Sequence, residues 1–314
     1  MVRKLDKEKN YLNINVDSIE QDINDEKFKK AIDYGESTEY YDPDADNPEL
    51  YEDLALALLN GNQLPNNKYK FKVEFEPVYI KHIRHQRYVD NIENIKDIKK
   101  IKHIRFDIFD DKNDLVKTFY LTTDYIGASK NKAQFAEGKD KYIDSDLARL
   151  SLDEIVAFLN ETRKLGGHIF LPTLIQFPGN DKCEKRNVHT LNQAKGFNLN
   201  DRFDLYLLDL NNYYINGKTS ESMQPVFDYF SSWLDLFDDF KGYVDFFKLN
   251  DFVSDDYTQV INLLTGEYFD KGTKVTPEIN VLPKDHDGYL AYAQNTVKII
   301  KKRNELIVDI INEK

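Results

Sequence analysis

Cysteine is almost absent from the sequence, which contains a single one, Cys183. One cysteine cannot form a disulfide within the chain, and such cysteine usage is typical of a reducing compartment. The sequence also lacks any run of about 18 apolar residues of the kind that spans a membrane. Its first residues, MVRKLDKEKNYLNINVD, contain no apolar core of a secretory signal. We therefore expect a soluble, cytoplasmic protein that binds no membrane.

Basic residues are missing from residues 31–67, where nine acidic residues occur. Residues 68–105 reverse this balance, with eleven basic residues against five acidic ones. The net charge of the chain is −12, which opposes general binding to DNA or RNA because such binding depends on cationic groups. The basic window has two interpretations, a solvated face that pairs with the acidic segment or a strip that faces phosphate groups.

Recognisable metal and phosphate-loop motifs are missing as well. The acidic run DPDADNPE at residues 42–49 lacks the glycine-hinged loop and closing glutamate of a calcium site. His82 and His85 could share a zinc ion, yet no cysteine or carboxylate lies at a suitable spacing. The glycines before His168 lack the Lys-Ser/Thr pair of a phosphate loop. The sequence thus predicts no metal site and identifies no cofactor.

Apolar residues make up 41% of the 314 residues, enough to form a sizeable core. Residues 67–77 alternate between apolar and charged side chains, a pattern that predicts a half-buried strand. Residues 101–109 and 115–123 flank a polar turn and predict an antiparallel hairpin. Residues 168–175 read as a buried strand, in which Pro172 indicates a sheet edge or a bulge.

Helical periodicity recurs along the rest of the chain. It predicts helices in seven ranges, 18–33, 48–59, 151–164, 200–215, 222–240, 257–264 and 285–312. The helix at 151–164 begins with a capping box, and we expect Gly166 to end it as a helix C-terminal glycine. Aromatic residues of the 222–240 helix share one face, which should lie against the core.

These elements predict an α+β fold, with a small antiparallel sheet in the N-terminal half packed against a mainly helical C-terminal half. No linker separates independent domains, so we expect one globular domain over residues 1–314. Within it, an acidic helical segment extends to about residue 66, a sheet-containing part covers 67–190 and a helical part covers 191–314.

The stretch from 165 to 210 contains the side chains most suited to chemistry. One catalytic candidate and six ligand-binding candidates occur there, namely His168, and then Asn192, Gln193, Lys195, Gly196, Arg202 and Asp204. His168 begins the buried strand, where partial burial could tune a general acid or base. The alternative for His168 is a hydrogen-bonded core histidine.

The segment TLNQAKGF at residues 190–197 precedes a predicted helix. Its two amides can read the edge of a base or a sugar, Lys195 can neutralise a phosphate and Gly196 permits close backbone approach. The helix start adds free N–H donors. The alternative is a loop held by its own amide side chains. Arg202 and Asp204 are two residues apart at the helix start, so we expect them not to face the same way.

The chain resembles a widespread bacterial family of unknown function in four blocks that occur in the same order: GGHIFLP, TLNQAKGF, DRFDL and FKGYVDFF. The family's blocks read GGxxxFP, TINxARGF, DRFDL and GYVxFF. The resemblance extends from about Asp42 to Leu306 and implies no activity. Lys195 occurs where the family has arginine, which removes the forked geometry for a phosphate. His168 occurs where the family often has methionine.

Two functional hypotheses follow. In the first, the protein is an enzyme or a binder of a phosphate-bearing small molecule, such as a nucleotide, held by the loop and helix start at 190–204. In the second, it is a non-catalytic interaction module that binds a basic protein partner through acidic surfaces, for example in phage defence, counter-defence or regulation. The first requires a pocket beside Lys195, and the second requires partner binding that weakens steeply with salt.

Overall fold

The structure, a computed structural model of the chain, describes residues 48–60, 62–78, 101–126, 154, 157–158, 161–162, 164–173, 202–281, 283 and 285–313. The helix predicted at 18–33, the histidines His82 and His85 and the ligand loop at 190–197 lie outside these residues.

Four antiparallel strands form one sheet in the order β1-β2-β3-β4. The strands are β1 (Lys70–Val78), β2 (Ile101–Phe109), β3 (Leu115–Tyr125) and β4 (His168–Thr173). The predicted strand at 67–77 and the hairpin are confirmed, and the strand predicted at 168–175 is confirmed over β4. The latter is an edge strand, as its proline indicates.

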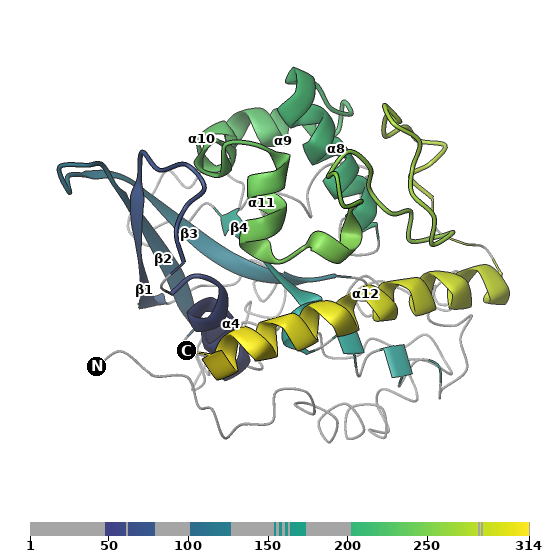
Figure 1. Cartoon of the computed structure of the whole chain (residues 1–314), viewed down its shortest axis with the longest axis horizontal. Coiled ribbons are helices and arrows are strands. Elements are labelled where there is room, and N and C mark those ends of the chain that lie inside the picture. The colour runs from purple at the N-terminus through teal and green to yellow at the C-terminus, as the bar shows by residue number, and fades with distance from the viewer. Residues whose placement is uncertain are drawn as a thin grey trace, which may run out of the picture.

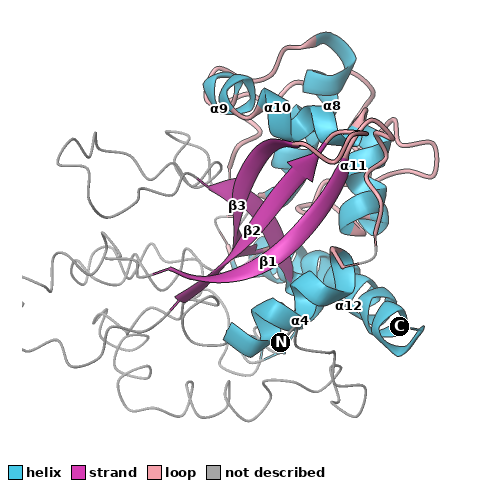
Figure 2. Cartoon of the chain, turned by 90° about the vertical axis from the view of Figure 1, so that its left-hand side faces the viewer, coloured by secondary structure: helices cyan, strands magenta, loops and turns pink. Residues whose placement is uncertain are grey.

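Alternation along the strands gives the sheet one apolar face and one polar face. Phe71 of β1 stacks on Phe106 of β2, with ring centroids 4.4 Å apart, while the charged residues of β1 point the other way. Trp233 packs its ring against Phe106 and Phe119, at centroid distances of 5.4 and 5.2 Å. The described helices gather on this apolar side, as Figure 2 shows. The sheet and the helices therefore share one aromatic core.

Three predicted helices are confirmed with small changes of bounds, as α4 (Pro48–Leu58), α8 (Phe203–Asn216) and α12 (His286–Glu313). α12 runs beside α4 along one end of the molecule, and α8 stands with the shorter helices at the other end (Figure 1). The α+β class predicted from the sequence is thus confirmed. None of the helices in the described ranges has both the length and the apolar content of a bilayer span.

The helix predicted at 222–240 is wrong as a single element. It is divided into α9 (Gln224–Tyr229), α10 (Ser231–Leu234) and the 3-10 turn η6 (Asp235–Phe237), and α11 (Phe240–Phe247) follows. Asp238 has a φ of 61°, which no continuous right-handed helix permits. Asp239 then caps α11 by accepting a hydrogen bond from the Gly242 N–H. The predicted core face survives the breaks, because Phe227, Trp233 and Phe237 are all buried.

The short helix predicted at 257–264 is also wrong. Two antiparallel bridges occur there, Val253 with Val260 and Ile261 with Tyr268, after a 3-10 turn η7 (Asn250–Phe252). Tyr257 has a φ of 58°, which breaks the helical path. The spacing of apolar residues at 257–264 resembles that of a helix. The backbone N–H and C=O groups of this segment, however, form hydrogen bonds across the two bridges and to other elements. Apart from the bridge residue Tyr268, the described residues from 266 to 283 form turns and irregular backbone.

Gly166 does not end a helix with a left-handed residue, so that expectation is wrong. It lies in the 3-10 turn η5 (Leu165–Gly167), and its φ is not positive. A Cβ atom on Gly166 would lie 2.5 Å from the backbone of α12, at the Asn304 nitrogen and the Ile300 oxygen. The Gly166 N–H donates to the Asn304 side chain at 3.1 Å. The glycine is needed because α12 rests directly on this backbone.

Candidate functional site

Arg202 and Asp204 form a two-pronged ion pair, contrary to the expectation that they face apart. Arg202 Nε donates to Asp204 Oδ1 at 3.0 Å, and the second guanidinium nitrogen donates to Oδ2 at 2.9 Å. The rule that side chains two residues apart point in different directions holds only within a helix, and Arg202 precedes α8 with a φ of −125° and a ψ of 56°. Both side chains are buried, with exposed fractions of 1% and 0%.

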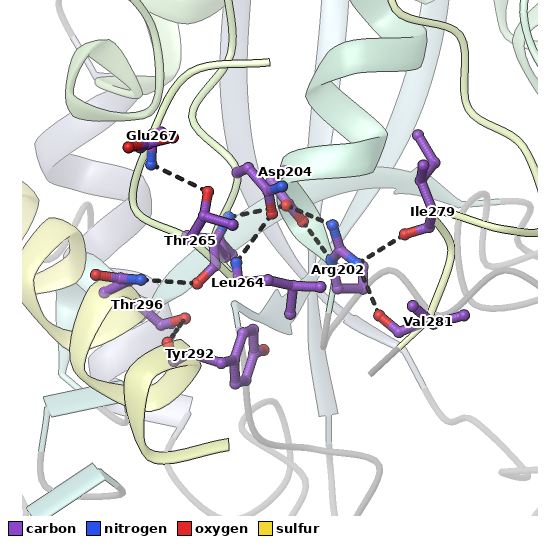
Figure 3. Close-up of polar contacts among 12 residues, drawn as sticks. Arg202, Asp204, Leu264, Thr265, Glu267, Ile279, Val281, Tyr292 and Thr296 are labelled. Carbon is purple, nitrogen blue, oxygen red and sulfur yellow. Dashed lines mark hydrogen bonds and ion pairs between the residues drawn. The ribbon is translucent and has the colours of Figure 1, made fainter. Parts of the chain in front are cut away.

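The same pair fastens an irregular part of the chain to the start of α8 (Figure 3). The third guanidinium nitrogen of Arg202 donates to the backbone oxygens of Ile279 and Val281, at 2.8 and 2.7 Å. Asp204 Oδ2 also accepts from the Leu263 N–H at 3.0 Å. We call this arrangement the DRFD clamp. It connects helix α8 to two loops that have little regular structure of their own.

The DRFD clamp leaves Arg202 little capacity for a ligand. Four of the five guanidinium N–H groups already donate to protein oxygens, and the side chain is removed from solvent. The other ligand-binding candidates, Asn192, Gln193, Lys195 and Gly196, lie outside the described residues. A ligand site in that loop therefore stays a prediction, and the geometry of the described residues gives the last two candidates, Arg202 and Asp204, a structural task.

His168 is buried at the first position of β4, with 2% of its surface exposed. Its backbone oxygen accepts a 2.6 Å hydrogen bond from Arg303 of α12. The burial agrees with the core alternative for this histidine, and its role as an acid or base stays a prediction. His168 therefore lies beside a second buried arginine that the sequence analysis did not single out.

Arg303 connects the end of α11 to η5 and β4. Its guanidinium donates to the backbone oxygens of Phe247 and Lys248, and also to that of Gly166. Burial lowers the pKa of Arg303 to about 9, while the neighbouring Tyr243 acts in the opposite direction. We call this arrangement the Arg303 clamp. Its signal in the sequence is a charged residue at a core-facing position of α12, between Ile300 and Ile307.

The segment from α9 to the start of α11 exposes several carboxylates to solvent. The acidic ridge, as we define it, consists of Asp228, Asp235, Asp238 and Asp239, all exposed. No lysine or arginine occurs between residues 218 and 241. The pKa of Tyr213 is raised by burial and then by the charges of Asp228 and Asp235, so these two carboxylates approach one tyrosine from different elements.

Asp209 is a further carboxylate, buried in α8. It accepts hydrogen bonds from the Ser220 N–H, at 3.1 Å, and from the Ser220 hydroxyl, and so fixes the connection between α8 and α9. Burial raises its pKa to about 6, although the Ser220 bonds oppose the shift. The folded state thus favours the protonated acid. Its contribution to stability is present below about pH 4 and is lost as the pH rises through 6.

We expect Asp209→Asn to become more stable relative to the wild type as the pH rises from 4 to 7.5. The relative gain in the free energy of unfolding should be up to about 3 kcal/mol, because each pKa unit corresponds to about 1.4 kcal/mol. Urea unfolding at a series of pH values measures it. The exposed Asp270→Asn is the control and should show no such trend. A constant difference between Asp209→Asn and the wild type over this range would contradict the prediction.

Among the described residues, neither a group of potential metal ligands nor the comparisons with known proteins point to a further site. Within the described ranges, no three His, Cys, Asp or Glu side chains converge as a metal-binding group. One family model matches residues 91–307, from just before β2 to near the end of α12, and is described as a family of unknown function. Searches among curated proteins and among solved structures each gave no match. Function must therefore be argued from geometry and charge.

Proposed function

The chain belongs to this family of unknown function, DUF6994, and from its charge distribution we propose that it is a non-catalytic interaction module that binds a basic protein partner. The acidic ridge is the observation that supports this function. Residues 202–281 contain fourteen acidic against six basic residues, so this part of the chain is itself strongly negative.

The ridge is rigidly placed, which favours recognition over a merely solvated surface. Asp235 follows α10, whose Trp233 is anchored in the aromatic core, and Asp239 is fixed as the cap of α11. Ordered carboxylates lose little side-chain freedom when they bind a cation. Opposite charge on the partner would also steer the encounter, an effect that salt weakens.

The phosphate-ligand alternative receives less support from the described residues. Arg202, one of its two proposed cations, is buried and bonded in the DRFD clamp. Lys195 would then have to bind a phosphate without that second cation. The acidic ridge, in contrast, is accessible and has no lysine or arginine in its own segment.

We expect a polylysine peptide to bind the protein, and its affinity to fall as salt is added. Neutralising three ridge carboxylates, in Asp228→Asn, Asp235→Asn and Asp238→Asn together, should weaken binding about tenfold, since each exposed charge pair contributes up to about 0.5 kcal/mol. Asparagine suits this purpose because it keeps the shape of aspartate without its charge and is among the residues that adopt a positive φ. Isothermal titration calorimetry measures the effect.

The matched control removes three exposed carboxylates from α12, with Glu305→Gln, Asp309→Asn and Glu313→Gln. It changes the net charge equally and should leave the affinity within about twofold. An equal loss of polylysine affinity in both variants would show that only the net charge matters and would contradict the proposal that the acidic ridge is the binding surface. A thermal shift with nucleotides that Lys195→Ala abolishes, without polylysine binding, would instead favour the phosphate-ligand hypothesis.

A further inference from the structure

Strand β1 forms one edge of the sheet in the part of the chain that the structure describes. Among the described residues it is hydrogen-bonded as a strand only to β2, and it is the outermost strand of the sheet. Figure 2 shows β1 nearest the viewer, with no described helix in front of it. The outer N–H and C=O groups of such an edge are available to another strand.

The side chains at this edge form a self-complementary pattern. Lys72 and Glu74 lie on the polar face, form an ion pair within the chain and have 64% and 41% of their side-chain surfaces exposed. Phe71, Val73 and Phe75 lie on the apolar face, pack against the core and are only half-buried. The strand thus presents apolar surface that its own helices do not fully cover.

We propose that β1 pairs with β1 of a second copy of this chain, antiparallel and centred on Val73, so that two four-stranded sheets join into one. In this register Val73 lies opposite itself across the twofold axis. Lys72 then lies opposite Glu74 of the second copy, and Phe71 lies opposite Phe75. Directly opposed residues share one face of an antiparallel pair, so both the charged and the aromatic pairs stabilise the contact.

Neighbouring registers fit less well. A shift of two residues in one direction places Lys72 opposite Lys72, and a shift in the other direction places Glu74 opposite Glu74. Like charges directly opposite one another destabilise a strand pair. A shift of one residue places Lys72 opposite Val73 and turns the apolar faces of the two sheets to opposite sides. The charge pattern therefore selects the register centred on Val73.

The charged residues of an edge strand can either prevent or promote pairing with a second copy. The order of positive and negative charges along the strand decides which of the two occurs. A strand that carries one sign of charge repels its copy in the antiparallel arrangement. Here lysine and glutamate occupy positions symmetrically placed about Val73, so the strand attracts its copy. The inference rests on the edge of the sheet and does not depend on the proposed function.

Analytical ultracentrifugation over a wide range of protein concentration tests the pairing. The mass of the wild type should rise from 36.9 kDa toward twice that value. Lys72→Glu and Glu74→Lys should each stay monomeric, because positions 72 and 74, which lie opposite one another in this register, then carry like charges. An equimolar mixture of the two variants should dimerise, since two glutamates on one copy then lie opposite two lysines on the other. The double exchange, Lys72→Glu with Glu74→Lys, should dimerise like the wild type.

Lys112→Glu, an exposed charge reversal in the turn after β2, is the control for net charge and should dimerise normally. Circular dichroism should show that every variant is folded. A wild type that remains at 36.9 kDa at the highest concentration would overturn the proposal. So would single-charge variants that dimerise as well as the wild type, or a mixture that remains monomeric.

Discussion

Replacing Arg303 with methionine is expected to lower the free energy of unfolding by about 3–5 kcal/mol. Methionine fills a similar volume but donates no hydrogen bond, so the buried oxygens of Gly166, His168, Phe247 and Lys248 lose this donor. Each buried acceptor left unpaired costs about 1–3 kcal/mol. Removing a desolvated charge offsets part of this loss, because burial already depresses the pKa of the guanidinium.

Urea unfolding measures the change, and Arg303→Lys gives the informative comparison. An ammonium group keeps the charge but cannot reach acceptors on two sides in the fixed geometry of a guanidinium, so lysine should restore less than half of the loss. Lys298→Met, an exposed change on the same helix, should alter stability by less than about 0.5 kcal/mol. An Arg303→Met protein within about 1 kcal/mol of the wild type would show that the Arg303 clamp contributes little.

The second large effect is expected at Asp204. Replacement by alanine leaves the Arg202 guanidinium buried without a countercharge, and the Leu263 N–H loses its acceptor. Breaking a buried ion pair from one side costs about 3–5 kcal/mol, so Asp204→Ala should be destabilised by that amount. Asp204→Asn, which retains one acceptor oxygen and the shape, should lose less.

A double-mutant cycle separates the pair from its surroundings. Arg202→Met combined with Asp204→Leu removes both charges, and its destabilisation should be smaller than the sum of the two single effects by at least about 1 kcal/mol. Amide hydrogen exchange at residues 263 and 279–281, which the DRFD clamp holds in place, should also be faster in these variants than in the wild type. Additive single effects, or unchanged exchange at these residues, would argue against the DRFD clamp.

The strands were predictable because alternation is a local property of the sequence. β1 shows it over its whole length, and the turn between β2 and β3 is built from polar residues. The breaks in the helix at 222–240 were not predictable from periodicity, because the aromatic spacing continues through them. The signal was the pair Asp238-Asp239, which suits a residue of positive φ in a tight turn followed by a helix cap.

The candidate site was predicted in part. The DRFDL block stabilises the fold, because its Arg202 and Asp204 bind each other rather than a ligand. Helical spacing could not reveal this, because Arg202 lies outside α8 and its partners Ile279 and Val281 are distant in sequence. Arg303 was missed for the same reason, since its acceptors are backbone oxygens that no side-chain pattern encodes.

The close seat of α12 on Gly166 has a consequence for biosynthesis. The N–H of Gly166 is bonded to the side chain of Asn304, which the ribosome adds 138 residues later. Until α12 has been synthesised, η5 and His168 lack the backbone of α12 that packs against them and the hydrogen bonds that Arg303 donates to them. The sheet of the nascent polypeptide therefore stays incompletely covered at this point until α12 has been synthesised.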